Sequence, residues 1–226
     1  MVYKPPMHFQ ATIGSITDDM AKKNEEEIRK ELDACDAPPK DGVASLFKAM
    51  KEGGFFTSPS SHAYHLCIYG GLAQHSLNVF KTLKSMAPKY FPDVPARSIV
   101  ITGLLHDFCK MGSYKNKKTW KKVDESEFDL PNGKTVQVEP DFWFSYDGYE
   151  YDNSDPLGHG EKSVIRIQQH LPLLDDEIYA IRWHMGAWDT LGEYSKTQAL
   201  NKAIEKSRLL RGLMIADQVA TYFLED

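Results

Sequence analysis

The sequence predicts an all-α fold in which a helical core carries one small β-hairpin insertion. Apolar residues recur at helical spacing over most of the chain, which is typical of amphipathic helices. Between Lys115 and Asp152 the pattern changes, and aromatic and β-branched residues alternate with polar ones as they do in strands. Hydrophobic residues make up 42% of the 226 residues and aromatic residues 12%, which excludes a disordered chain. A chain of this length is expected to bury a sizeable core.

The N-terminal part is predicted to hold two helices. A strongly charged segment predicts a helix that begins at Ser15 or Thr17 and ends before Pro38. Its charges are interpreted as a solvated face. Residues 41–52 predict a second, short helix, and the segment rich in glycine and serine that follows predicts a loop.

Two further helices are predicted in the middle of the chain. From Gly71 to Met86 apolar residues recur at helical spacing, and His75 falls on the same apolar stripe. The connection to the next helix, expected over about residues 96–109, is marked by three prolines, Pro88, Pro92 and Pro95. Proline favours helix ends and connections, so the first of these two helices is expected to end before Pro88.

The β insertion is predicted at about residues 115–152. Asn132 and Gly133 lie between its two alternating segments, and this dipeptide favours the tight turn of a hairpin. Helical patterns resume after the insertion and predict three helices, over about residues 160–171, 175–186 and 196–224, with Asp175 as the N-cap of the second.

Charge and cysteine content narrow the function classes. The net charge of -5 argues against a broad nucleic-acid-binding surface, so a small or locally bound substrate is expected. Three cysteines without a CxxC pair form no disulfide framework, which suits a reducing compartment. We expect no N-terminal signal sequence, because the first residues lack its pattern, and no apolar run approaches the roughly 18 residues of a membrane span. We therefore expect a cytoplasmic protein without a membrane partner, and its oligomeric state stays open.

Six polar residues occupy positions where the helical patterns would place an apolar residue or a simple helix start: His75, His106, Asp107, His159, His184 and Asp217. Taken singly, each histidine is more simply explained as a hydrogen-bonded core residue, and each aspartate as an ion-pair or capping partner. Taken together, imidazoles and carboxylates on rigid helices are the ligands that a divalent transition metal requires. No thiolate belongs to the set, which argues against a structural zinc site of the cysteine type. Six donors exceed the needs of one tetrahedral ion, so two ions that share Asp107 would account for the count.

Five short motifs carry these residues in the order His, His-Asp, His, His, Asp: GGLAQHS, LLHDFCK, GHGE, RWHMG and IADQ. In this combination they resemble the HD-domain metal-dependent phosphohydrolase superfamily. The resemblance covers about residues 60–222. The opening motif is most similar to the branch with bacterial HD-domain 3′-5′ exoribonucleases and relaxase-associated HD domains. Membership implies an all-α core and the hydrolysis of phosphate esters, often in nucleotides.

The resemblance also implies roles for the six residues. A first metal ion would be held by His75, His106, Asp107 and Asp217. A second ion, bridged by Asp107, would be held by His159 and His184. The expected cofactor is therefore one or two divalent transition metal ions, either manganese, iron, cobalt or nickel, because geometry rather than ligand identity selects among them. Asp107 is the principal catalytic candidate.

Three basic side chains are candidates for contact with the substrate. Lys110, one helical turn past His106, could neutralise charge on a phosphate and is a catalytic candidate, although a surface lysine at a helix C-terminus is an equal explanation. His65 could contact the substrate or donate a proton to the leaving oxygen, and is equally plausible as a loop residue. Lys115 lies in a segment of six lysines with interleaved aromatic residues, which suits phosphate neutralisation and base stacking. A solvated edge strand is the simpler alternative for that segment.

The predicted function is a metal-dependent phosphohydrolase or phosphodiesterase that hydrolyses a phosphate ester of a nucleotide or short oligonucleotide through a metal-activated water. Two alternatives stay open: an HD-type diiron oxygenase that acts on a small polyol or phosphonate, and a non-catalytic nucleotide-binding regulator. Residues 1–58 are expected to form an N-terminal helical extension, and residues 59–226 the HD-domain core with its hairpin insertion.

Overall fold

The computed structural model describes residues 9–12, 16–35, 39–62, 65–123, 127–129, 135–137, 142–152 and 154–225. Most of these residues are helical, so the predicted all-α class is confirmed. In chain order the helices are α1 (Asp18–Ala34), α2 (Lys40–Gly53), α3 (Gly71–Tyr90), α4 (Ala96–Leu105), α5 (His159–Gln168), α6 (Asp175–Trp183), α7 (Tyr194–Lys206) and α8 (Arg208–Val219). Short helical turns follow three of them: η1 (Phe108–Lys110), η2 (Gly186–Asp189) and the π-helical η3 (Ala220–Leu224).

The hydrophobic core lies among the helices. α3 packs against both α4 and α8, and side chains such as Leu77, Leu104 and Leu213 are completely buried between them. The N-terminal helices contribute to the same core, because Ile28 of α1 and Leu46 of α2 are also fully buried in it. No helix among the described residues has the length and apolar character needed to cross a membrane.

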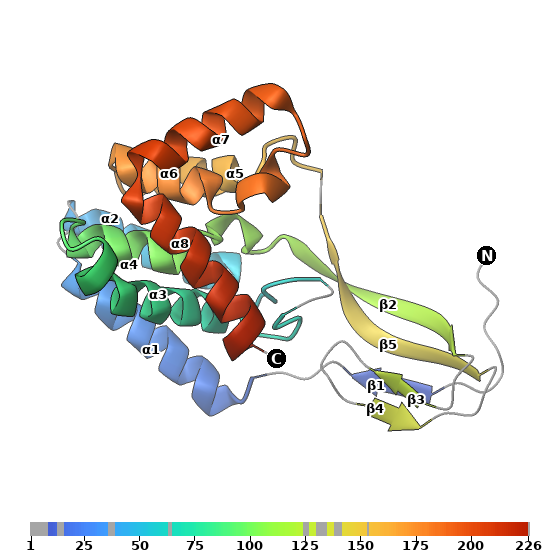
Figure 1. Ribbon diagram of the computed structural model, residues 1–226. Helices are drawn as coiled ribbons and strands as arrows, with labels where there is room; N and C mark the ends of the chain where they lie inside the picture. The colour runs from blue at the N-terminus through green and yellow to red at the C-terminus, as the bar shows by residue number, and fades with distance from the viewer. Residues whose placement is uncertain are drawn as a thin grey trace.

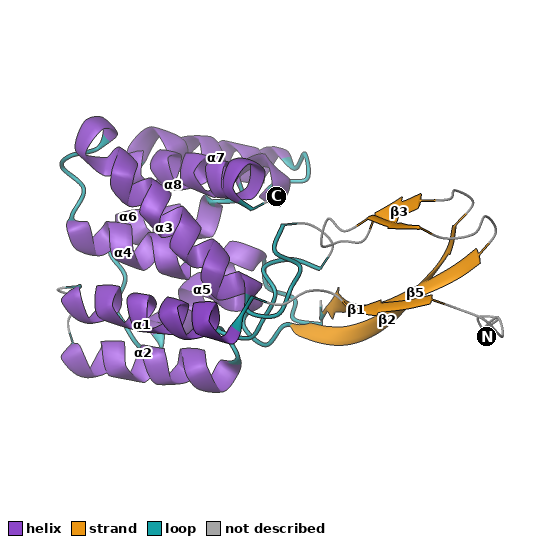
Figure 2. Ribbon diagram, turned by 90° about the horizontal axis from the view of Figure 1, so that it is seen from below, coloured by secondary structure: helices purple, strands orange, loops and turns teal. Residues whose placement is uncertain are grey.

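The β insertion projects from the helical body as an elongated ribbon, which Figures 1 and 2 show from two directions. Its long strands are β2 (Tyr114–Val123) and β5 (Phe142–Tyr151), which pair antiparallel over their whole length. β1 (Phe9–Thr12) pairs in parallel with the other edge of β5. A separate antiparallel pair consists of β3 (Glu127–Asp129) and β4 (Thr135–Gln137).

The ribbon confirms the predicted strand character of the insertion and adds one strand that the sequence did not predict. The turn predicted at Asn132 and Gly133 lies outside the described residues. β1 falls in a segment expected to be irregular. Its four residues are extended because they pair with β5, more than 130 positions away in the chain, and a local sequence pattern cannot indicate such a contact.

Two predicted helix boundaries are wrong. α3 continues through Pro88 to Tyr90, although the proline was expected to end it. Pro88 lies in the last turn, so the hydrogen bond that it removes and the kink that it favours affect only the end of the helix. The single helix predicted over residues 196–224 is divided at Ser207, whose hydroxyl accepts a hydrogen bond from the Leu210 N–H at 2.8 Å and caps α8.

Two smaller differences concern the helices that carry or precede metal motifs. The helix predicted to reach residue 109 ends at Leu105, so His106 and Asp107 lie in the tight turn before η1. Asp175 is the first residue of α6 and not its N-cap, a position that Leu174 occupies. The carboxylate that accepts from the Leu174 N–H belongs to Glu177, at 2.9 Å.

Candidate metal centre

The six predicted ligands converge because several helix ends meet at one place. His75 lies in the second turn of α3, and His106 and Asp107 directly follow α4. His159 is the first residue of α5, His184 follows the last residue of α6, and Asp217 lies near the end of α8. Of the six, His75, His106, Asp107 and His184 are buried, and the side chains of His159 and Asp217 are each 19% exposed.

Two glycines allow the helices that carry these ligands to approach closely. A Cβ atom at Gly160 would lie 2.2 Å from the carbonyl oxygen of Arg182, so α5 and α6 are in backbone contact beside His159 and His184. A Cβ at Gly103 would lie 2.8 Å from Cα of Phe80, which brings α4 equally close to α3. Small residues at these two crossings therefore set the separation of the histidines.

All four histidines have the same orientation. Their Nδ1 atoms face outward, and each lies at hydrogen-bonding distance from a partner: His75 at 3.0 Å from Glu225, His106 at 3.1 Å from the Gly103 carbonyl, His159 at 3.2 Å from Cys109 Sγ, and His184 at 2.8 Å from the Ile181 carbonyl. A proton on Nδ1 leaves the Nε2 lone pair available to a ligand, which is the tautomer that a metal-binding imidazole needs.

The Nε2 atoms and two carboxylates face one another at the centre. His75 Nε2 lies 3.3 Å from His106 Nε2 and 3.3 Å from Asp217 Oδ1. Asp107 Oδ1 lies 2.5 Å from His159 Nε2 and 3.4 Å from His184 Nε2. His184 Nε2 is buried and has no hydrogen-bond partner among the described residues.

Electrostatics show how the cluster is balanced without a metal. Burial lowers the pKa of His75, but hydrogen bonds to Asp217 and Glu225 outweigh this and raise it to about 10. Burial also lowers the pKa of His159, but the interactions with Asp107 and Cys109 outweigh this effect and raise the pKa to about 10. For Asp107 and Asp217 burial opposes ionisation, and the neighbouring cations nevertheless hold each carboxyl pKa below its usual range. The Nε2 protons of the His75 and His159 imidazolium groups thus occupy the positions at which these residues would bind a cation.

These residues fit a divalent metal. The ligand atoms of His75, His106 and Asp217 lie within 4.8 Å of one another, and so do those of His106, Asp107 and His184. Burial lowers the pKa of His106 to about 3, so this imidazole is neutral and its inward lone pair is free to coordinate. Nitrogen and carboxylate donors of this kind suit first-row transition metals. The Nε2 of His184, which has no hydrogen-bond partner among the described residues, is the atom that a bound cation would satisfy.

The three substrate candidates have different surroundings. Lys110 Nζ lies 2.7 Å from Asp107 Oδ2 with a side chain only 13% exposed, so the surface alternative for this lysine is wrong. The ring of His65 is 4.9 Å from that of His75, and both of its nitrogens are buried without a partner among the described residues. Lys115 is on the exposed ribbon, where its Nζ is 2.6 Å from Asp152 Oδ2.

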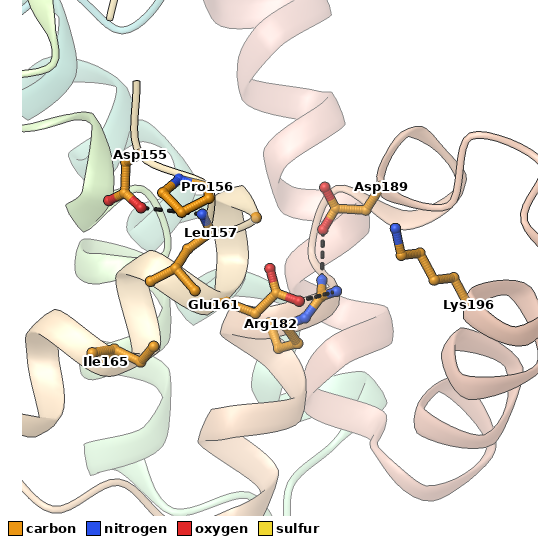
Figure 3. A pocket seen from close by; sticks show the side chains of 9 residues that line it. Asp155, Pro156, Leu157, Glu161, Ile165, Arg182, Asp189 and Lys196 are labelled. Atoms are coloured by element: carbon orange, nitrogen blue, oxygen red, sulfur yellow. Dashed lines mark hydrogen bonds and ion pairs between the residues drawn. The ribbon is translucent and has the colours of Figure 1, made fainter. Parts of the chain in front are cut away.

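A charged cleft lies beside the centre, between the N-terminus of α5 and the start of α7 (Figure 3). Arg182 is its central cation, and its guanidinium binds Glu161 at 2.6 Å and Asp189 at 2.7 Å. Arg182 also packs over the ring of Trp183. Two carboxylates already neutralise this arginine. We therefore interpret its ion pairs as a structural connection between α5, α6 and η2.

Sequence reasoning missed Glu225, which contacts His75 from outside the centre, and Asn78, which contacts Glu225. Glu225 follows η3 near the end of the chain and reaches His75, and no periodic pattern singles it out. Asn78 lies one turn after His75 on α3 and donates to Glu225 at 2.9 Å. Its polar side chain on the buried face of a helix was a signal in the sequence that could have identified it.

Comparisons with known proteins gave one match. A family model described as HD domain matches residues 72–222, a stretch that holds all six predicted ligands and covers more than half of the chain. No curated protein and no solved structure matched the chain.

Proposed function

Because the chain belongs to the HD domain family, whose members are typically metal-dependent phosphohydrolases, we propose that it hydrolyses a phosphate ester of a nucleotide or short oligonucleotide. The observation that carries the proposal is the buried cluster in which four Nε2 atoms face two carboxylates, with Lys110 beside Asp107. We assign the ligand roles to His75, His106, Asp107, His159, His184 and Asp217. One or two divalent ions held there would supply an acidified water and neutralise charge on phosphate oxygens.

The charges of the cluster favour an anionic substrate. In the metal-free protein three carboxylates, those of Asp107, Asp217 and Glu225, face Lys110 and the imidazolium groups of His75 and His159. Two divalent cations in place of these two protons would leave an excess of positive charge. An anionic phosphate ester or phosphonate suits such a site better than a neutral polyol, so the charge balance argues against the polyol form of the oxygenase alternative.

Lys110 and His65 are the side chains that we propose to contact the substrate. Asp107 raises the pKa of Lys110 above its usual range against the effect of burial, so this ammonium group stays charged and can bind a phosphate oxygen. Burial lowers the pKa of His65 to about 4, which keeps its ring neutral, with one N–H donor and one acceptor. Ser60 and Ser61 hold the loop by donating to the His65 carbonyl at 2.7 and 3.0 Å.

The ribbon favours a small substrate over a long nucleic acid. Lys115, Lys117 and Lys118 are each paired with a carboxylate of β5 or of the residue that follows it. Their charge is therefore neutralised within the ribbon, and the chain as a whole carries a net charge of -5. A substrate role for Lys115 requires that its pair with Asp152 open.

The proposal is tested by product analysis with metal-loaded protein. The panel holds nucleoside mono-, di- and triphosphates, cyclic nucleotides and short oligonucleotides, each with manganese, iron, cobalt or nickel. We expect hydrolysis of at least one class, and its loss in Asp107→Asn, which retains the shape of the side chain but not its charge. Glu150→Gln on the ribbon is the matched control and should retain full turnover, because that carboxylate is exposed.

The panel also separates the alternatives. Absence of hydrolysis with every metal would overturn the proposal. Oxygen consumption by the iron-loaded protein with a polyol or phosphonate would then indicate an oxygenase. Tight nucleotide binding without either reaction would indicate a regulator.

A further inference from the structure

Glu225 is a buried carboxylate whose position the ligand set does not explain. Its side chain is 1% exposed, although the three residues before it, Tyr222 to Leu224, are all exposed. Both carboxylate oxygens lie 3.0 Å from Nδ1 of His75. This contact is on the side of the ring opposite to the atom that faces Asp217. Glu225 therefore contacts the predicted ligand His75 on the outer side of its ring and lies outside the centre itself.

A line of side-chain amides holds this carboxylate in place. Asn78 Nδ2 donates to Glu225 Oε1 at 2.9 Å, and Gln74 Nε2 donates to Asn78 Oδ1 at 2.9 Å. Asn24 of α1 completes the line by donating from Nδ2 to Gln74 Oε1 at 3.0 Å. The amide oxygens of Asn78 and Gln74 each accept from the next amide in the line, which fixes the orientation of these two side chains.

His75 differs from the other buried histidines in the charge of this outer partner. His106 and His184 donate their Nδ1 protons to the neutral backbone carbonyls of Gly103 and Ile181. His75 is directed by an ionised carboxylate, and a charge-assisted hydrogen bond is stronger than a neutral one. It also makes the imidazole a better electron-pair donor at Nε2.

We propose that Glu225 is a positioning residue that sets the orientation and donor strength of His75 toward the metal, and that the amides of Asn78, Gln74 and Asn24 anchor it to α1. The inference rests on the metal centre of the proposed function and is independent of its phosphate chemistry. It also gives the N-terminal helix a role at the site, since α1 supplies the outermost member of the line.

The test measures metal binding without turnover. Metal-free protein is titrated with cobalt(II), with the ligand-field absorption bands recorded, and with manganese(II) in competition with a chelator. Loss of an outer carboxylate typically lowers metal affinity about 10- to 100-fold. We expect a loss in this range for Glu225→Ala, with altered cobalt bands, and a smaller one for Glu225→Gln, whose amide oxygen still accepts from His75. Asn78→Ala should lose less again, because the bond from His75 to Glu225 remains.

Glu177→Gln is the matched control. Glu177 is as buried as Glu225 and accepts from Ser98 at 2.8 Å and from Arg97 at 3.1 Å, but it contacts no predicted ligand. This variant should lose thermal stability and keep wild-type metal affinity and cobalt bands. If Glu225→Ala does not fold, the metal affinities of Asn78→Ala and of the isosteric Glu225→Gln test the proposal.

Wild-type affinity in the folded Glu225 and Asn78 variants would overturn the inference, and so would an equal loss in Glu177→Gln. Failure of the wild-type protein to bind either metal would overturn it as well. Normal metal binding without hydrolysis of any phosphate ester would overturn the proposed function alone and leave the role of Glu225 standing.

Discussion

The metal centre and the β2–β5 ribbon are both dense in charged residues, but their charges are arranged in opposite ways. In the ribbon, Lys117 and Glu150 form a pair whose side chains are 50% and 58% exposed. In the centre, Asp107 and Lys110 are 2% and 13% exposed, and Asp107 also faces four imidazoles. Exposed pairs are satisfied by water as well as by each other, whereas buried donors need one another or a cation. Charge density in a sequence therefore does not identify a site until burial is known.

The comparison predicts its largest effect at Asp107. Asp107→Asn removes the charge that faces His159, His184 and Lys110, so metal binding and turnover should both be lost. The affinity for manganese(II) and the rate of product formation measure this. Far-UV circular dichroism should remain unchanged, because no helix depends on this carboxylate for its cap. A metal-loaded, active variant would contradict the assignment of Asp107.

The pH dependence of metal binding is the next largest effect. His75 and His159 have folded pKa values of about 10, above the usual value of 6.5. The stability that their imidazolium forms add to the metal-free protein is thus complete below pH 6.5 and is lost as the pH rises towards 10. A metal must displace these protons, so its affinity should rise over the same window, by up to about tenfold per pH unit for each proton released.

Calorimetric titration of the metal at pH 6.5 and pH 8.5 in buffers of different ionisation enthalpy counts the protons released. The ribbon variant Lys117→Ala should show the same pH dependence as the wild-type protein. An affinity that is independent of pH would contradict the protonated state of the metal-free cluster.

The two glycines that flank His159 provide a sharper structural comparison. Gly160→Ala would place Cβ 2.2 Å from the backbone oxygen of Arg182, which cannot move without separating α5 from α6. We expect about 1–3 kcal/mol of destabilisation and weaker binding of the metal that His159 and His184 hold. In Gly158→Ala the Cβ would meet only the carboxylate end of Glu161, which can rotate away at the expense of its ion pair with Arg182, so the destabilisation should be smaller. Denaturant unfolding and metal stoichiometry of both variants check this, and equal effects would show that the close helix contact is unimportant.

The smallest effect is predicted for the ribbon. A double-mutant cycle of Lys117→Ala and Glu150→Ala should give a coupling free energy below about 1 kcal/mol, because exposed ion pairs contribute little. Metal affinity should stay at the wild-type value in all three variants. A loss of nucleotide binding in Lys117→Ala would show instead that the ribbon reaches the substrate.

Features of the fold that depend on contacts between residues close in the chain were predictable, and those that depend on distant residues were not. Helical periodicity predicted α3 and α5 within a few residues, since amphipathic spacing is a local property. The division between α7 and α8 at Ser207 was missed, although a serine is a common N-cap, because apolar spacing continues across it. β1 was missed because its partner β5 lies far away in the chain.

The sequence by itself determined the helical core, the strand character of the insertion and the identity of the six polar residues that its helical patterns leave unexplained. Only the tertiary structure decided that ribbon lysines such as Lys117 pair with carboxylates, that Lys110 is buried against Asp107, and that Glu225 contacts the outer side of the His75 ring. The physical reason is that periodicity reports which face of an element is buried, while partners and protonation depend on which elements meet. Glu225 and His75 are separated by 150 residues, and only folding brings them to 3.0 Å.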